Sequence, residues 1–202
     1  MTFETRYAIP HGNDLLPAFP ILMPDTWQRA PTQVCVPLVK GLSLRHVPLL
    51  APVHFIGDPN SGTFQRAYVR TERLEAIGAS MDEYLGEAVR NLRERRATWT
   101  EVMPGTIASM DDFLSAERIV DAAFMQEAAR MLSAPGGSVL VGIPQRAHLF
   151  ATSFARASGD QNHLQAFCGV LAKLFADAGP NGLTPWPILV TEGRIISIME
   201  IG

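Results

Sequence analysis

The sequence predicts an α+β fold: a mixed, largely antiparallel sheet packed by about four helices, with a C-terminal β-hairpin. Three observations predict it. Short strand-like runs bounded by turn residues gather early in the chain, single amphipathic helices follow, and two apolar runs meet at Glu192-Gly193. Because strands and helices do not alternate regularly, this order favours α+β over a parallel βαβ array.

Residues 1–32 are expected to form a proline-rich extended arm, and residues 33–202 a single α+β domain. Six prolines fall between Ile9 and Pro37, and proline neither continues a helix nor donates a hydrogen bond to a central strand. The stretch "LLPAFPILMP" is too apolar for a solvated linker. We therefore expect the arm to pack against the body of the protein or against a second subunit.

Strand-like segments are expected next, separated by turn residues. They cover 34–39, 43–50, 52–56 and 64–69, with the turn "GDPNSG" at 57–62 before the last of them. This arrangement is typical of a meander or hairpin.

Ser80 and Glu83 form an S-x-x-E capping box, and apolar residues then recur at helical spacing through "SMDEYLGEAVRNLRERR". The stretch "TWTEVMPGTIASM" predicts two short strands around Pro104-Gly105. A second helix is expected from Asp111 to about Leu132, and its broad apolar face should form the centre of the core.

The last third of the chain predicts one strand, two helices and a hairpin. The strand covers 138–143, a helix starts at about Gln145, and a longer helix runs through "DQNHLQAFCGVLAKLFADAG" to Gly179-Pro180. The two apolar runs joined at Glu192-Gly193 complete the fold as a C-terminal hairpin.

Composition narrows the classes of function. Seventeen Lys and Arg stand against 20 Asp and Glu, for a net charge of -3, so we expect no nucleic-acid partner. No stretch approaches the ~18 apolar residues of a membrane span, and no apolar targeting segment is expected at the start. Cys35 and Cys168 form no C-x-x-C motif, which favours a reducing cytoplasm.

Five segments spread from Val34 to Met199 carry a resemblance to a known family: "VCVPLV", "YVRTERLEAIGASMDEYLGEAVRNL", "DDFLSAERIVDAAFM", "VLVGIPQRAHLF" and "ILVTEGRII". Their order resembles that of the YtpQ-like family of uncharacterised bacterial proteins. The resemblance implies an α+β domain without an established activity, a family sometimes labelled as signal-transduction regulators. Family members carry an acidic residue just before the helix after the Pro144-type turn, where this chain has Ala147 and His148.

Arg118, Arg146 and His148 are the candidates for binding a ligand or partner. The stretch "GIPQRAH" places Arg146 and His148 at a corner after an apolar strand, and Arg118 in "SAERIVDAAF" would point into the same cleft. The alternative is a structural role for all three. Arg146 and His148 would then lie in the polar first turn of a helix, and Arg118 would pair with Asp121 on a helix surface.

No catalytic, cofactor or metal site is predicted. The turn "GIPQRAH" offers no nucleophile, no G-x-S-x-G motif occurs, and the glycines of "APGGSVL" precede a strand instead of a phosphate-binding helix. His46 and His54 are expected to be partly buried on adjacent strands. They lack a third ligand nearby, whereas zinc requires three or four.

The sequence therefore favours a non-catalytic cytoplasmic domain that acts through protein contacts, with a partner or as a homo-oligomer, in a regulatory role. The absent catalytic motifs and the apolar arm support this hypothesis. The alternative is an enzyme or small-ligand-binding protein with a cleft near Arg118, Arg146 and His148.

Overall fold

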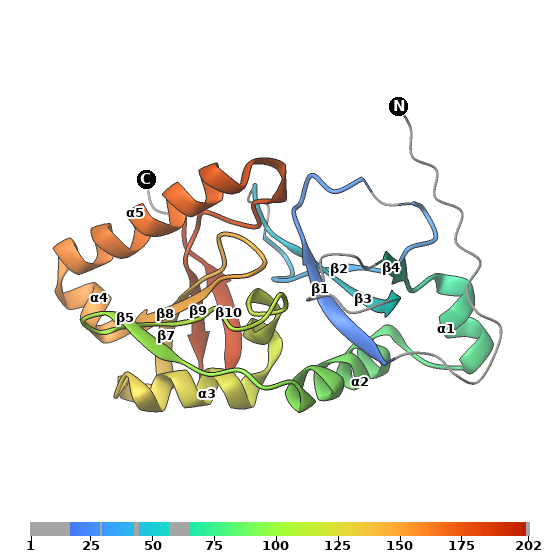
Figure 1. Ribbon diagram of the computed structural model, residues 1–202, viewed down its shortest axis with the longest axis horizontal. Coiled ribbons are helices and arrows are strands. Elements are labelled where there is room, and N and C mark those ends of the chain that lie inside the picture. Colours follow the sequence, from blue (N-terminus) through green and yellow to red (C-terminus); the bar gives the residue numbers. More distant parts are fainter. Residues whose placement is uncertain (1–16, 29, 43–44, 57–64, 201–202) are drawn as a thin grey trace.

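A computed structural model describes residues 17–28, 30–42, 45–56 and 65–200. It shows an α+β fold in which two antiparallel sheets lie beside each other along the long axis of the molecule (Figure 1). Four helices of seven or more residues pack on these sheets, and the chain ends in a hairpin. The predicted fold class is confirmed.

The smaller sheet is built around one long strand. Its strands are β1 (Ala18–Met23), β2 (Val36–Pro37), β3 (Leu49–Ile56) and β4 (Gln65–Tyr68), and β3 pairs with each of the other three. Strand β1 comes from the segment expected to form an arm, and its described residues pair with β3 of the same chain. The early part of that segment and the predicted turn at 57–62 lie outside the described residues.

Strand β3 corrects the prediction of separate strands over 43–50 and 52–56, because it runs unbroken through Pro52. Pro52 lies opposite Pro20 of β1, and its carbonyl oxygen accepts a hydrogen bond from the Val69 N–H at 3.2 Å. The main chain of Pro52 therefore faces the edge where β2 ends and β4 begins. A missing N–H disturbs little at such a gap, since no residue of β2 or β4 is paired with Pro52 there.

The larger sheet has six strands in the order β10-β9-β7-β8-β6-β5, and all of its pairs are antiparallel. The strands are β5 (Thr100–Met103), β6 (Thr106–Ser109), β7 (Ser138–Gly142), β8 (Leu149–Ser153), β9 (Ile188–Thr191) and β10 (Arg194–Ile198). The strand pair around Pro104-Gly105 and the C-terminal hairpin are both confirmed.

Five α-helices and three short 3-10 turns are described. They are α1 (Thr71–Ile77), α2 (Met81–Glu94), α3 (Ala122–Met131), α4 (Phe154–Gly159), α5 (Gln161–Ala178), η2 (Ala116–Val120), η3 (Pro135–Gly137) and η4 (Gly179–Asn181). The capping box of α2 is confirmed, because Ser80 Oγ accepts from the Glu83 N–H and Glu83 Oε2 accepts from the Ser80 N–H.

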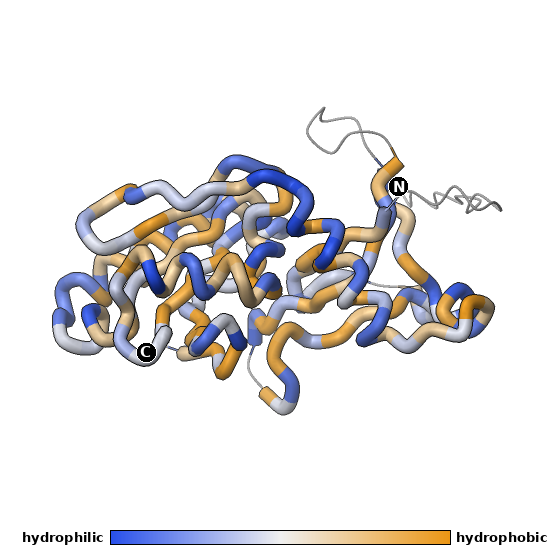
Figure 2. Tube along the Cα trace, turned by 90° about the horizontal axis from the view of Figure 1, so that it is seen from below, coloured by the Kyte–Doolittle hydropathy of each residue, from blue (hydrophilic) through white to orange (hydrophobic). Residues whose placement is uncertain are grey.

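The larger sheet is covered on both faces. Val139 and Val141 of β7 pack in the cluster that contains the apolar face of α3, whereas Leu140 between them packs with Phe167 and Leu171 of α5. This alternation follows from the two-residue period of a strand. Helix α3 therefore lies on one face, and α4 and α5 lie on the other (Figure 1). Hydrophobic and hydrophilic residues accordingly alternate along the helices (Figure 2).

The predicted helix from Asp111 begins only at Ala122, preceded by bends and the 3-10 turn η2. Side-chain hydrogen bonds explain the delay. Ser115 Oγ donates to the main-chain carbonyl oxygen of Asp112 at 2.7 Å, and Asp121 caps α3 by accepting from the Ala123 N–H at 3.2 Å. Such bonds compete with the helical ladder.

The prediction of a helix from about Gln145 is wrong. Residues 145–148 form the turn of the β7–β8 hairpin, in which the His148 N–H donates to the Gln145 carbonyl oxygen at 3.1 Å. The following residues form β8, because Leu149 and Phe150 bury their side chains on opposite faces of the sheet. Pairing with β6 and β7 outweighs a helical conformation for "LFATS", and helix α4 begins only at Phe154.

The β9–β10 turn gives a stability prediction for glycine. Glu192 and Gly193 both have a positive φ, and a Cβ at Gly193 would lie 2.4 Å from the Ala122 carbonyl oxygen. Gly193→Ala should lower the free energy of unfolding by about 1–2 kcal/mol for the left-handed backbone and by about 1–3 kcal/mol more for the overlap. Gly136→Ala is the matched control, since its φ is +60° with nothing within 4 Å.

Urea denaturation of the two glycine variants separates the backbone cost from the steric cost. Equal losses of stability for Gly193→Ala and Gly136→Ala would show that α3 shifts freely away from the turn.

Candidate functional site

The segment that links β6 to α3 lies between the two sheets and carries buried charges. Asp112, Glu117, Arg118 and Asp121 are all buried there. Arg95 at the end of α2 binds Asp112 with two hydrogen bonds of 2.6 and 3.1 Å. Buried charges are tolerated when they are paired and hydrogen-bonded, so this segment connects the elements around it.

One ion pair, between Glu117 of η2 and Arg146 of the β7–β8 turn, connects the two sheets through hydrogen bonds to Leu22 of β1. Glu117 Oε1 accepts from Arg146 Nε at 3.2 Å and from the Leu22 N–H of β1 at 3.0 Å. Arg146 Nη2 donates to the Leu22 carbonyl oxygen at 2.5 Å, and the Arg146 carbonyl oxygen accepts from the Ala116 N–H. The β7–β8 turn of the larger sheet is thus fastened to β1 of the smaller one.

The electrostatics of this pair are dominated by burial. Burial raises the pKa of Glu117 to about 7, although the positive charge of Arg146 and the Leu22 N–H act in the opposite direction. The second carboxylate oxygen, Oε2, is buried and has no hydrogen-bond partner among the described residues. Glu117 is therefore a carboxyl group that can change its charge near neutral pH.

A cavity of about 230 Å³ lies beside Arg146, where the two sheets meet. Its walls come from four places in the chain: the end of β1 with the loop after it, strand β4, the β7–β8 turn and η4. The lining residues are Met23, Pro24, Thr26, Trp27, Arg66, Arg146, Pro180 and Asn181. We call this space the arginine cavity.

Two guanidinium groups of the arginine cavity approach the same aromatic ring. The Cζ atoms of Arg66 and Arg146 lie 5.7 and 5.5 Å from the centre of the Phe113 ring, within the range of cation–π attraction. Burial lowers the pKa of Arg146, and the positive charge of Arg66 lowers it further. Since arginine stays protonated in proteins, two positive charges face one small space.

Of the three residues that the sequence proposed, only Arg146 lines the arginine cavity. Arg118 is buried elsewhere: its Nη2 donates to the Arg95 carbonyl oxygen at 2.7 Å, and its Cζ lies 5.1 Å from the Phe124 ring centre. The prediction that Arg118 pairs with Asp121 on a helix surface is wrong, because Asp121 accepts a hydrogen bond from Arg93 instead.

His148 lies in the β7–β8 turn and stacks on Phe150 with ring centres 5.9 Å apart. Burial lowers its pKa, and its Nδ1 has no hydrogen-bond partner in the part of the chain that the structure describes. Neither His148 nor Arg118 lines a described cavity together with Arg146. The structure therefore does not bring the three candidates together.

Sequence patterns did not indicate Glu117, Arg66 or Trp27 as site residues. Glu117 had one local signal, because it lies in "SAERIV" beside residues that belong to a buried apolar face. Arg66 and Trp27 had none. They belong to segments far apart in the chain, and only the packing of the loop after β1 against β4 places Trp27 and Tyr68 4.8 Å apart.

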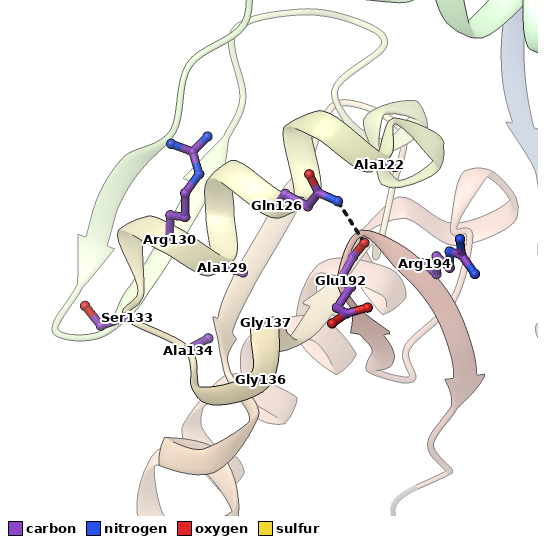
Figure 3. Close-up of a pocket in the computed structure, with 10 residues that line it drawn as sticks. All are labelled: Ala122, Gln126, Ala129, Arg130, Ser133, Ala134, Gly136, Gly137, Glu192 and Arg194. Atoms are coloured by element: carbon purple, nitrogen blue, oxygen red, sulfur yellow. Dashed lines mark hydrogen bonds between the residues drawn. The ribbon is translucent and has the colours of Figure 1, made fainter.

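A larger cavity of about 710 Å³ lies between α3, the loop around η3 and the β9–β10 turn (Figure 3). Gln126 Nε2 donates across it to the Glu192 carbonyl oxygen at 3.1 Å. Figure 3 shows Arg130 and Arg194 pointing in different directions, away from each other. Charged groups therefore do not converge in this cavity as they do in the arginine cavity.

The two histidines considered for metal binding lie apart. His46 is in a turn with φ of 62°, and its Nδ1 lies 3.8 Å from Asp25, whereas His54 in β3 bonds to the Tyr84 hydroxyl at 2.8 Å. The prediction that His46 and His54 lie on adjacent strands is therefore wrong for His46. Within the described ranges, no three His, Cys, Asp or Glu side chains are grouped so as to hold a metal ion.

The fold and the site define the protein as a two-sheet α+β protein with a buried Glu117–Arg146 pair. Comparisons with models of protein families, with curated proteins and with solved structures found no match to this chain. Its resemblance to the YtpQ-like family stays a prediction from the sequence. Among the helices of the described part, none has the length and apolar character needed to cross a membrane.

Proposed function

We propose that this protein is a non-catalytic binding domain whose ligand is a small anion held by Arg66 and Arg146. The observation that carries the proposal is that two arginines line one cavity where the sheets meet, with both guanidinium groups near the Phe113 ring. Arginine presents a planar array of donors that matches carboxylate, sulfate and phosphate oxygens. Ligand sites also occur preferentially where two parts of a fold meet.

The size and the other walls of the arginine cavity support a small ligand. Its volume of about 230 Å³ lies below the ~300–1,000 Å³ of pockets for drug-sized molecules. Thr26 and Asn181 add neutral hydrogen-bonding groups, and Trp27 adds an aromatic wall. These features suit a sulfate, a phosphate or a short carboxylic acid.

The chemistry of the lining supports binding without catalysis. Thr26 is the one hydroxyl group among the described lining residues, and no described His, Asp or Glu lines the cavity as a base for it. Cys35 and Cys168 form no disulfide with each other, which supports a reducing compartment such as the cytoplasm.

Calorimetric titration with sulfate tests the proposal directly. Arg66→Ala should weaken sulfate binding about 10- to 100-fold, because a hydrogen bond to a charged group contributes roughly 1.5–3 kcal/mol. Arg156→Ala is the matched control, since Arg156 lines a different cavity and should leave the affinity unchanged. The titrations are made at constant ionic strength, because salt screens exposed charges.

Two outcomes would contradict anion binding at this site. One is the absence of saturable sulfate binding at any accessible concentration. The other is an equal loss of affinity in Arg66→Ala and Arg156→Ala, which would show a general effect of net charge.

Contact with a protein partner or with further copies of the chain is a second candidate function, in a regulatory role. A hollow of about 540 Å³ between the β5–β6 hairpin and the end of α3 is lined in part by Ile107, Met131 and Leu132. Met131 is 51% exposed, and Val102 on the neighbouring strand is 42% exposed. Exposed apolar side chains around a hollow favour association. Light scattering tests self-association, and a monomer at every concentration would exclude it.

A further inference from the structure

We infer that binding of an anion in the arginine cavity is coupled to uptake of a proton by Glu117, so that the anion is held more tightly as the pH falls. This inference rests on the proposed function and adds its regulation. It follows from the position of one side chain, Arg146, which belongs both to the cavity wall and to the buried ion pair.

Arg146 divides its donors between the two roles. Its Nε donates to Glu117 Oε1, and its Nη2 donates to the Leu22 carbonyl oxygen. None of these bonds uses Nη1, and Arg146 lines the cavity. An anion bound there would therefore share the positive charge on which Glu117 depends.

Glu117 has little else to stabilise its negative charge. It is fully buried, and among the described residues Arg146 is the ionised side chain to which it is bonded. When a second anion approaches Arg146, the two negative charges disfavour each other, and protonation of Glu117 relieves the conflict. Oε2 has no partner in the described structure, so a proton there would leave both bonds to Oε1 in place.

The other charged or titratable groups around the Glu117–Arg146 pair belong to β4, to η2 and to the β7–β8 turn. Strand β4 supplies Arg66 and Tyr68, and both act on the charge of Arg146. Strand β1 supplies uncharged groups, which are the main chain of Leu22 and the sulfur of Met23. Arg118 follows Glu117 in η2, and the nearby carboxylates of Asp112 and Asp121 favour its charged form. His148 lies two residues from Arg146, and burial lowers the pKa of its imidazole, so it needs a control.

The direction of the pH effect follows from linkage. Burial raises the pKa of Glu117 to about 7, so in the free protein the group is ionised mainly above that pH. Above about pH 7, binding of one anion is accompanied by uptake of one proton on Glu117, so the affinity for the anion falls by up to about tenfold per pH unit. Below it, Glu117 is already protonated, and the affinity becomes independent of pH.

Sulfate is the probe, because its charge stays constant over the range from about pH 6 to about pH 9. In the wild-type protein we expect the sulfate affinity to fall by up to about tenfold per unit above about pH 7. Glu117→Gln should bind sulfate at every pH as tightly as the wild-type protein does at low pH. His148→Gln and Glu101→Gln should keep the wild-type pH profile.

Proton uptake can also be measured without any variant, which covers the case in which Glu117→Gln does not fold. Calorimetry in two buffers of different ionisation enthalpy should show about one proton taken up per sulfate above about pH 7.5. Sulfate binding with no proton uptake, or with a flat pH profile, would overturn this inference and leave the proposed function standing. Absence of sulfate binding at every pH would overturn the proposed function itself.

Discussion

Replacing Glu117 by alanine should lower the free energy of unfolding by about 3–5 kcal/mol, the range for removing one partner of a buried ion pair. The change leaves the buried Arg146 guanidinium without its carboxylate and the Leu22 N–H without an acceptor. Both losses occur where β1 meets the β7–β8 turn, so the contact between the two sheets should weaken. Urea denaturation at neutral pH measures the effect.

Glu87→Ala is the matched control, because Glu87 pairs with Arg90 on an exposed face of α2. An exposed pair contributes at most about 1 kcal/mol. A double variant, Glu117→Leu with Arg146→Met, should recover much of the loss, since apolar residues of similar volume often replace a buried pair without cost. If Glu117→Ala were as stable as Glu87→Ala, the buried pair would not fasten the sheets.

The same carboxyl group gives a pH dependence of stability with a definite sign. Burial raises its pKa from 4.5 in the unfolded chain to about 7 in the folded protein. The folded state therefore binds the proton more tightly, and the stability from this group is fully present below about pH 4.5. That stability is lost as the pH rises through about 7, and Glu117→Gln should remove this dependence.

Replacing Ile119 by alanine should lower the free energy of unfolding by about 2–5 kcal/mol, the range for large-to-small changes in a packed core. Ile119 is fully buried in the cluster that holds Phe124 of α3 and Val141 of β7. Truncation removes apolar contacts and leaves a cavity between η2 and the larger sheet, which that sheet is too rigid to fill. Thermal or urea unfolding measures the loss.

Ile196→Ala provides the same chemical change at an exposed position. Ile196 of β10 is 53% exposed, and its truncation should change stability by no more than about 0.5 kcal/mol. Equal stability of the two variants would contradict the placement of the core. Arg118→Ala would hardly change the stability if Arg118 only formed a pair on the surface. Because the side chain is buried against Phe124, we expect the variant to be clearly less stable than the wild-type protein.

Elements whose signals lie within a few residues could be predicted from the sequence. The capping box at Ser80 and Glu83 started α2, and the turns at Pro104-Gly105 and Glu192-Gly193 each joined two strands. The end of the long helix at Gly179 was equally clear. In each case the decisive hydrogen bond or backbone conformation involves neighbouring residues, so the local sequence contains the whole cause.

The candidate site shows the limit of such signals. Arg146 was proposed from the sequence, but the role of its corner was not, because the same residues suit a helical turn and a hairpin turn. Arg66 and Trp27 lie far from Arg146 in the chain and reach the cavity only through the pairing of β4 with β3 and the packing of the loop after β1. Their relation to Arg146 depends on contacts between distant segments.

By itself the sequence determined the α+β class, the main helix α2, the long helix α5 and the hairpins around local turns. Tertiary structure alone decided that 149–153 is a strand, that 111–120 is not a regular helix, and that Glu117 is buried against Arg146. Local propensities differ by roughly 1 kcal/mol or less per residue. Sheet pairing and burial of a charge involve several times that energy, so the distant partners determine the outcome wherever the two conflict.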